Sequence, residues 1–328
     1  MTGAAAPTPA PAPVFLVGAS RSGTTLLRLM LNEHPDLKIP AESHFLGALL
    51  PRFGPTATLA GAQLDEAVTT VASFDQWRDD YAYTAAELRA AVGNGPLTMA
   101  ELVDRIFRLE VGSAPARWGD KSPPYLRWVD LLLECFPAGQ VIAIVRDPRD
   151  VYASLARLGW FGGTPWSIGR YLAECGEYVR RWRRELPDDR FRVVRYEDLV
   201  LDTERVLHEV CAFLGLPFVS EMHEFFAHAA DNLPAREITG HHAKLRRAPS
   251  RDDVERWRSS HAYLRLAEIE ALTATVMDEY GYARRVPDWA CASLATEARL
   301  RSHLRAPRDV VERNVGQVVR RIRAARRR

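Results

Sequence analysis

The sequence of 328 residues contains little lysine, little cysteine and no long hydrophobic run. Lys38, Lys121 and Lys244 are the only lysines among 44 basic residues, so arginine is the usual cation and each lysine is a candidate for a specific role. The four cysteines are far apart and form no Cys-x-x-Cys pair, which argues against a zinc site or a disulfide framework. No segment approaches the roughly 20 apolar residues of a membrane span. These absences predict a cytoplasmic protein of a reducing compartment.

The composition excludes further classes of protein. Hydrophobic residues make up 47% of the chain and charged residues 26%, which excludes a largely disordered chain, a collagen and a coiled coil. The first thirteen residues are rich in proline and alanine and contain no basic residue, so they do not resemble a signal peptide. We predict a disordered leader over 1–13, a folded domain over 14–283 and a basic C-terminal extension over 284–328.

The basic extension carries most of the positive charge. Residues 299–328 contain eleven arginines against Asp309 and Glu312. Within them, four aliphatic residues recur at helical spacing and predict an amphipathic helix over 309–325: Val311, Val315, Val318 and Ile322. Such a helix can lie on an anionic membrane, here the inner membrane face, or its apolar stripe can pack on the domain. Nucleic-acid binding is not expected, because no aromatic residues interleave with the arginines.

Short apolar runs alternate with helical patterns along the rest of the chain. Buried strands are predicted at 14–17, 140–145 and 191–194, with a further short strand at 37–40. Helices are predicted between them and continue at 203–214, 250–258 and 263–280, and the stretch 64–112 has a helical pattern. Strands that alternate with helices form parallel sheets covered on both faces. We therefore predict a single α/β domain of P-loop type, with a parallel sheet of about five strands flanked by helices.

The most specific motif follows the first strand. It is Gly18-Ala-Ser-Arg21-Ser22-Gly23-Thr24-Thr25, and a helical stretch comes directly after it. A glycine-containing loop between a strand and a helix directs backbone N–H groups and the positive helix end at a phosphate or sulfate. The loop has the G-x-x-x-x-G frame of a P-loop, but Thr24 stands at the position of the P-loop lysine. Arg21 can supply the missing charge. The alternative is a tight turn without a ligand.

This segment resembles the 5′-phosphosulfate-binding loop of the sulfotransferase superfamily, whose members transfer a sulfuryl group from 3′-phosphoadenosine 5′-phosphosulfate (PAPS). Its form is most similar to the tyrosylprotein sulfotransferases and related bacterial enzymes. These enzymes have proline where this chain has Ser20. The resemblance covers roughly residues 14–283 and implies that Arg21, Ser22, Gly23, Thr24 and Thr25 bind the donor.

A second motif follows the strand 140–145. Arg146 stands at the end of the strand, and Ser154 lies eight residues later in a predicted helix. A cation and a hydroxyl in these positions can bracket one phosphate. The pattern is similar to the 3′-phosphate motif of the family, and an arginine here argues against the Walker B aspartate of a kinase. The alternative, a surface Arg-Asp pair that caps the helix, does not explain the arginine.

The resemblance also identifies candidate catalytic residues. Glu42 lies 21 residues after Arg21, the spacing of the general base in the tyrosylprotein enzymes, while His44 is the second candidate because the cytosolic branch uses histidine. Lys121, within Trp118-Gly-Asp-Lys-Ser-Pro123, resembles the family lysine that stabilises the leaving phosphate. The alternatives are that Glu42 caps the next helix and that Lys121 is an exposed loop residue.

Three further residues are expected at the donor. Tyr196 begins Tyr-Glu-Asp-Leu, which resembles a family motif at the nucleotide, although a buried core tyrosine is the alternative. Arg247 and Arg256 lie in a segment, 241–258, that is similar to the loop that closes over the donor. The adjacent histidines His241 and His242 have no third ligand at a usual spacing, so we expect no metal.

The residues and the resemblance together predict a sulfotransferase. We expect in-line transfer of a sulfuryl group from PAPS to a hydroxyl of a carbohydrate, lipid or small natural product, with PAP as the second product and no metal. A P-loop kinase or NTPase is one rival, against which the missing P-loop lysine counts. A non-catalytic binding module that acts through its basic tail is the other.

Overall fold

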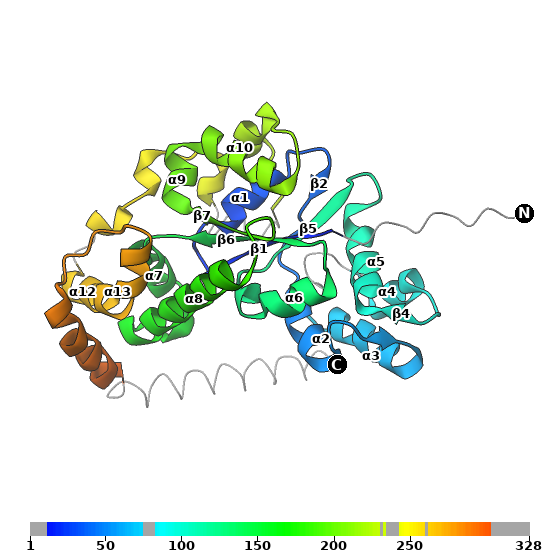
Figure 1. Cartoon of the computed structure of the whole chain (residues 1–328), viewed down its shortest axis with the longest axis horizontal. Coiled ribbons are helices and arrows are strands. Elements are labelled where there is room, and N and C mark those ends of the chain that lie inside the picture. The colour runs from blue at the N-terminus through cyan, green and yellow to red at the C-terminus, as the bar shows by residue number, and fades with distance from the viewer. Residues whose placement is uncertain (1–11, 75–82, 230–231, 234–242, 260–261, 303–328) are drawn as a thin grey trace, which may run out of the picture. The chain divides into compact units, whose positions relative to one another are not determined.

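The computed structural model describes residues 12–74, 83–229, 232–233, 243–259 and 262–302 (Figure 1). By its internal contacts the chain divides into two compact units. The first consists of Met1–Arg146 and Tyr178–Val254, and the second of Asp147–Glu177 and Glu255–Arg328. The leader up to residue 11 and the helix predicted over 309–325 lie outside the described residues.

The first unit is built on a five-stranded sheet in which every pairing is parallel. The strand order is β2-β5-β1-β6-β7, so the first strand of the sequence lies in the middle. The strands are β1 Val14–Gly18, β2 Leu37–Lys38, β5 Arg117–Lys121, β6 Gln140–Val145 and β7 Phe191–Arg195. The predicted α/β domain with about five parallel strands is confirmed.

Helices cover both faces of this sheet, as predicted. On one face, Val14 and Leu16 of β1 and Ile142 of β6 pack in a cluster with apolar residues of three helices. These helices, α1 Thr24–Leu31, α9 Tyr196–Leu201 and α10 Thr203–Leu214, lie on the same side of the sheet (Figure 1). Successive residues of a strand point to opposite faces, so Phe15 lies on the other side.

The opposite face is closed by aromatic side chains. Trp118 of β5 stacks on Phe107, with 4.2 Å between ring centroids, and meets Phe15 edge-on at 6.3 Å. Phe136 packs against both Phe15 and Trp118. Phe107 lies on α5 Met99–Val111, and Phe136 directly follows α6 Val129–Cys135, which is preceded by the 3-10 helix Pro123–Trp128.

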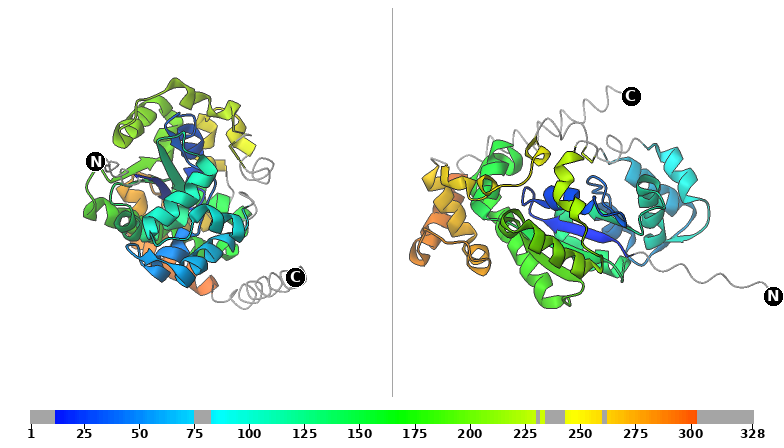
Figure 2. Two further views of the ribbon diagram at one scale, coloured as in Figure 1. Left: turned by 90° about the vertical axis from the view of Figure 1, so that its right-hand side faces the viewer. Right: turned by 90° about the horizontal axis from the view of Figure 1, so that it is seen from above.

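The stretch with a helical pattern at 64–112 forms three separate helices, which pack side by side (Figure 1 and Figure 2). Thr84 and Thr98 begin α4 and α5 with capping boxes, in which Glu87 and Glu101 bond back to the cap. A short antiparallel pair, β3 with β4, was not predicted and joins the segments around these helices. The bounds are α2 Leu46–Phe53, β3 Thr58–Leu59, α3 Gly61–Ala72, α4 Ala85–Val92 and β4 Leu97–Thr98.

The second unit is helical in its described part. The single helix predicted over 263–280 is wrong, because the chain leaves the helical conformation at Thr273, whose hydroxyl donates to the Ile269 carbonyl at 2.7 Å. The helix predicted over 250–258 is also wrong: Glu255, with a φ of +51°, separates two 3-10 turns. The α-helices of the second unit include α7 Pro148–Arg157, α12 Tyr263–Leu272, α13 Ala274–Glu279 and a helix over residues 288–302. The first part of α8 Pro165–Glu185 also belongs to this unit, and the helix continues into the first unit.

A buried arginine holds this second unit together. Arg149 of α7 donates to Asp147 at 2.7 Å and to Glu270 of α12 at 3.0 Å, and its guanidinium lies 3.7 Å from the Trp257 ring centroid. Asp147 also caps α7 by accepting the Arg149 N–H. A buried charge is tolerated when it is paired and hydrogen-bonded in this way. Among the described helices, none is long and apolar enough to cross a membrane.

Gly18 ends the central strand at a point where a side chain has no room. Its φ is +146°, and a Cβ there would lie 2.5 Å from the Ile144 carbonyl oxygen of β6. We predict that Gly18→Ala lowers the free energy of unfolding by about 2–4 kcal/mol, through backbone strain and overpacking. Denaturant unfolding followed by circular dichroism measures this loss. Gly95→Ala is the control, since nothing lies within 4 Å of the added methyl, and an equal loss there would contradict the prediction.

Candidate functional site

The loop between β1 and α1 has the shape of an anion-binding turn. Arg21 and Gly23 both have left-handed backbone angles, with φ of +73° and +108°. Gly23 is the N-cap of α1 and supplies no side-chain oxygen to the first N–H groups of the helix. A helix start of this kind is suited to bind an anionic group of a ligand. The Ser22, Thr24 and Thr25 side chains are buried in the same turn.

Tyr196 packs directly against this loop. A Cβ added to Gly23 would lie 2.4 Å from a carbon of the Tyr196 ring, so only glycine allows the ring and the loop to approach so closely. The tyrosine is the first residue of α9, directly after β7, and is 8% exposed. The structure therefore places this predicted donor residue beside the predicted anion loop.

Arg146 joins the same group at the end of β6. Its guanidinium lies over the Tyr196 ring at 4.0 Å from the centroid, a cation–π distance. It also donates to the main-chain carbonyls of Arg21, at 3.4 Å, and Asp253, at 3.0 Å. Arg146 is thus fixed between the loop after β1 and the segment around residue 253.

Arg247 belongs to the same segment. It donates to the Asp253 carboxylate at 2.8 Å, and Asp253 forms a capping box with Ser250. Hydrogen bonds from Arg247 to this carboxylate raise the pKa of the arginine. The structure therefore connects Arg247, through Asp253, to Arg146.

Two predicted donor residues belong to the second unit. Ser154 is half-buried on α7, and Arg256 is exposed at the start of a 3-10 helix, Arg256–Ser259. Asp150 of α7 accepts the Trp257 N–H at 2.8 Å, which fixes the turn that follows Arg256. The donor-binding roles of Ser154 and Arg256 remain predictions. His241 and His242 lie outside the described residues, as do the side chains of Ala243 and Lys244.

Glu42, Lys121 and His44 form one continuous group. The Lys121 ammonium donates to Oε1 of Glu42, and His44 Nε2 lies 2.7 Å from Oε2 of the same carboxylate. Lys121 is the last residue of β5 and its side chain is 2% exposed, whereas about 30% of Glu42 and 21% of His44 is exposed. The alternatives from the sequence are excluded: Lys121 is not an exposed loop residue, and α2 has Phe45 as its N-cap residue and no side-chain cap from Glu42.

The surroundings of Glu42 keep its carboxylate ionised. Burial raises the pKa of Glu42, but the Lys121 charge and the His44 contact outweigh burial and hold this pKa well below its usual range. A carboxylate that is partly open to solvent and ionised at neutral pH can receive a proton from a ligand. The group therefore combines a proton acceptor with a buried cation.

The sequence did not reveal a layer of residues beneath this group. Asp120 accepts hydrogen bonds from Ser43 Oγ at 2.5 Å and from Ser122 Oγ at 2.9 Å, and Tyr125 bonds to Ser43 at 3.0 Å. Burial raises the pKa of Asp120 to about 6, although the two serine hydroxyls act in the opposite direction. A signal was present in the sequence, because Asp120 and Ser122 flank the rare Lys121.

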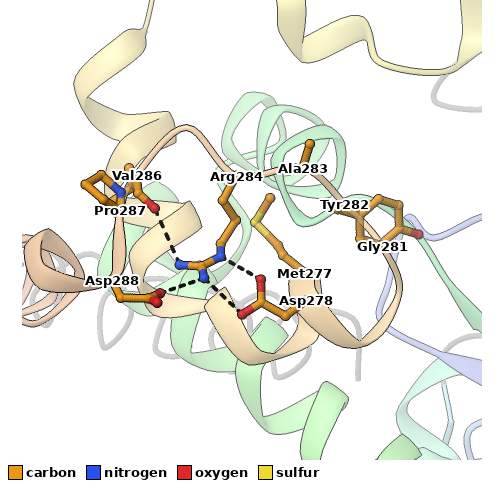
Figure 3. A pocket seen from close by; sticks show the side chains of 9 residues that line it. All are labelled: Met277, Asp278, Gly281, Tyr282, Ala283, Arg284, Val286, Pro287 and Asp288. Carbon is orange, nitrogen blue, oxygen red and sulfur yellow. Dashed lines mark hydrogen bonds and ion pairs between the residues drawn. The ribbon is translucent and has the colours of Figure 1, made fainter.

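A separate hollow lies in the second unit and contains none of the predicted site residues. Its volume is about 590 Å³, and Arg284 projects into it (Figure 3). Arg284 is held by Asp278, at 2.7 Å, and by Asp288, at 2.6 Å. Two carboxylates already neutralise this arginine, so the hollow offers little attraction for an anion. Elsewhere in the described residues, no group of three His, Cys, Asp or Glu side chains could hold a metal ion.

Known proteins resemble this chain along most of its length. The chain is 25% identical over 236 residues to a protein-tyrosine sulfotransferase of Drosophila melanogaster, covering 69% of this chain and 42% of that protein. It is 26% identical over 181 residues to an omega-hydroxy-beta-dihydromenaquinone-9 sulfotransferase of Mycobacterium tuberculosis, covering 51% and 42%. The chain spans between about a third and two thirds of the length of the curated relatives it matches.

The fold of the chain is also similar to that of a solved sulfotransferase domain. The sulfotransferase domain from the curacin biosynthetic pathway superposes with a TM-score of 0.57 at 22% identity, over 83% of this chain and 98% of that domain. A sequence model of the sulfotransferase family matches residues 13–221, and one of the sulfotransferase domain matches 165–279. The matched residues include the anion loop, Glu42, Lys121, Arg146 and Tyr196. The chain belongs to the sulfotransferase family.

Proposed function

We propose that the protein transfers a sulfuryl group from PAPS to a hydroxyl group of an acceptor. One observation carries the proposal: the carboxyl ends of four neighbouring parallel strands each lead to a candidate residue. Lys121 ends β5, Arg21 follows β1, Arg146 follows β6 and Tyr196 follows β7. Ligands of open parallel sheets bind at this edge.

The donor fits the residues that meet there. We assign the 5′-phosphosulfate to Arg21 and the backbone and hydroxyls of residues 22–25, since a left-handed loop at a helix start suits that anion. The 3′-phosphate is assigned to Arg146 with Ser154, the nucleotide contact to Tyr196, and the closing cations to Arg247 and Arg256. When bound, PAPS supplies an activated sulfuryl group and leaves as PAP.

The chemistry is assigned to Glu42 and Lys121. Glu42 receives the proton of the acceptor hydroxyl while the new oxygen–sulfur bond forms and the sulfur–oxygen bond to the leaving phosphate breaks. Lys121 stabilises the negative charge on that phosphate. One ammonium cannot give its full charge to Glu42 and to the phosphate at once. As Lys121 turns to the donor, Glu42 becomes a stronger base, which suits its role. His44, at the same carboxylate, is the second candidate for the base.

Phosphoryl transfer is not favoured. Thr24 occupies the position of the P-loop lysine, and β6 ends with Arg146 where a Walker B aspartate would hold magnesium. Family membership also argues against a purely non-catalytic module. We propose no metal in the reaction.

The acceptor is proposed as a hydroxyl of a carbohydrate, lipid or small natural product. The names of the relatives refer to tyrosine and to a hydroxylated quinone lipid, which supports a hydroxyl but fixes no single class. The donor motifs contact only the nucleotide. Action in the cytoplasm, with residues 299–328 at an anionic membrane, stays a prediction, because most of that segment lies outside the described residues.

Donor binding is tested by titration calorimetry without magnesium. PAP should bind, and ATP, which lacks the 3′-phosphate, should bind about tenfold more weakly or worse. Arg146→Ala should weaken PAP by about ten- to hundredfold and adenosine 5′-phosphosulfate much less, because a charged hydrogen bond to the 3′-phosphate is lost. The control is Arg192→Ala, because Arg192 lies on β7 and pairs with Glu209. Equal losses for both ligands would remove the assigned role of Arg146, and tighter binding of magnesium–ATP would favour the kinase.

The base is tested by turnover with labelled PAPS. Glu42→Gln should leave PAPS affinity near normal and lower turnover by about 10²–10⁴-fold, the usual contribution of a general base. His44→Ala should have a much smaller effect. If the larger loss belongs to His44→Ala, then His44 is the base and Glu42 only orients it.

The pairing of Lys121 with Glu42 has a consequence that needs no activity measurement. In Lys121→Met the partly buried carboxylate loses its cation, so the pKa of Glu42 should rise. Side-chain ¹³C NMR over a pH series measures this change, with Glu42→Gln used to assign the signal. Lys38→Met removes a lysine that donates to Asn232 and should leave the Glu42 titration unchanged. An unchanged titration in Lys121→Met would rule out the pairing.

A further inference from the structure

Asp120 is a buried carboxylate that the proposed reaction does not use. It is the fourth residue of β5, directly before Lys121, and is 0% exposed. Its hydrogen-bond partners are two serine hydroxyls, and no arginine or lysine of the described chain pairs with it. A buried charge without a cation costs stability, so folding alone does not account for an aspartate at this position.

The two serines connect Asp120 to each member of the catalytic group. Ser43 lies between Glu42 and His44 in the sequence, and its hydroxyl donates to Oδ2 of Asp120 at 2.5 Å. Ser122 follows Lys121, and its hydroxyl donates to Oδ1 at 2.9 Å. One carboxylate therefore joins the segment that carries Glu42 to the strand end that carries Lys121.

The backbone around His44 also depends on these contacts. His44 has a φ of +58°, a left-handed conformation that a residue with a side chain adopts only when its surroundings enforce it. Its N–H donates to Ser122 Oγ at 3.3 Å. Two residues on, the Leu46 N–H donates to the Tyr125 hydroxyl at 2.9 Å, and that hydroxyl contacts Ser43. The strained turn is therefore held by two hydroxyls: that of Ser122, which bonds to Asp120 directly, and that of Tyr125, which reaches Asp120 through Ser43.

We propose that Asp120 is a positioning residue that, through Ser43 and Ser122, holds Glu42 and His44 against Lys121 in the geometry that sulfuryl transfer requires. This rests on the proposed function. The position of a general base matters because a displacement of about 1 Å can cost about a hundredfold in rate. The charge of Asp120 matters because an ionised carboxylate accepts from both serines at once, whereas an amide has only one oxygen to offer.

The decisive variant is Asp120→Asn, which keeps the shape and removes the charge. We expect kcat to fall by about 10–100-fold, the KM for PAPS to stay within about twofold, and the thermal unfolding midpoint to stay the same or rise. The control is Asp104→Asn, which replaces the carboxylate that accepts the Trp118 Nε1–H of the same strand, and whose kcat should not change. Normal kcat in Asp120→Asn, or a fall in kcat and midpoint together, would overturn the positioning role.

A second variant keeps the test independent of one substitution. Ser43→Ala removes one of the two hydroxyls and should also lower kcat with little change in KM. The double variant should lose less than the sum of the two single losses in activation free energy, because both act through one connection. Additive losses would contradict that connection.

NMR separates this proposal from the proposed function. In Asp120→Asn the side-chain signals of Glu42 and His44 should shift in the donor-free protein, whereas Asp104→Asn should leave them in place. If the wild-type protein transfers no sulfuryl group but the signals shift, the positioning role stands and the function fails. Unshifted signals overturn the positioning role whatever the activity.

Discussion

The parallel pairing of β1 with β5 and β6 is the constraint on which the site depends. Leu16 of β1 aligns with Lys121, and Gly18 aligns with Ile144, so the three strands end close to one another. Parallel strands leave a sheet at the same edge, which brings the segments that follow them together. The loop after β1, the lysine of β5 and the arginine after β6 owe their proximity to this register rather than to their positions in the sequence.

The site is electrostatically complete without a bound donor. Lys121 is almost fully buried and has Glu42 as its partner, and Glu42 also contacts His44. A buried ammonium without a carboxylate would lower the stability of the protein. The pairing of Lys121 with Glu42 therefore stabilises both charges. In the proposed reaction an anionic donor competes with Glu42 for the same cation. Donor binding would then be coupled to the basicity of the proposed base.

The sequence predicted those elements in which the local pattern of apolar and polar residues matches the burial that the fold gives them. The apolar run 141–145 became a central strand, and the loop at 18–25 became a strand–loop–helix turn. The strand β5 was missed, because Arg117-Trp-Gly-Asp-Lys121 lacks a run of apolar residues. It is buried nonetheless, since Asp120 accepts from Ser43 and Ser122, and Lys121 donates to Glu42. No local sequence pattern indicates that buried polar side chains will find hydrogen-bond partners far away in the chain. The break at Thr273 has no local signal either: Thr69 and Thr70 make the same backward hydroxyl bond inside the continuous helix α3.

Gly23 and Tyr196 are 173 residues apart in the sequence but lie against each other in the fold. A side chain at 23 would occupy the volume of the ring at 196, so neither position can be replaced without regard to the other. Over evolutionary time the two are therefore expected to change together: a chain of this family that carries a larger residue at the first position must give up the aromatic ring at the second. With that ring it would also lose the surface on which the guanidinium of Arg146 rests. The glycine at position 23 thus leaves room for the aromatic ring over which an arginine from a different strand lies.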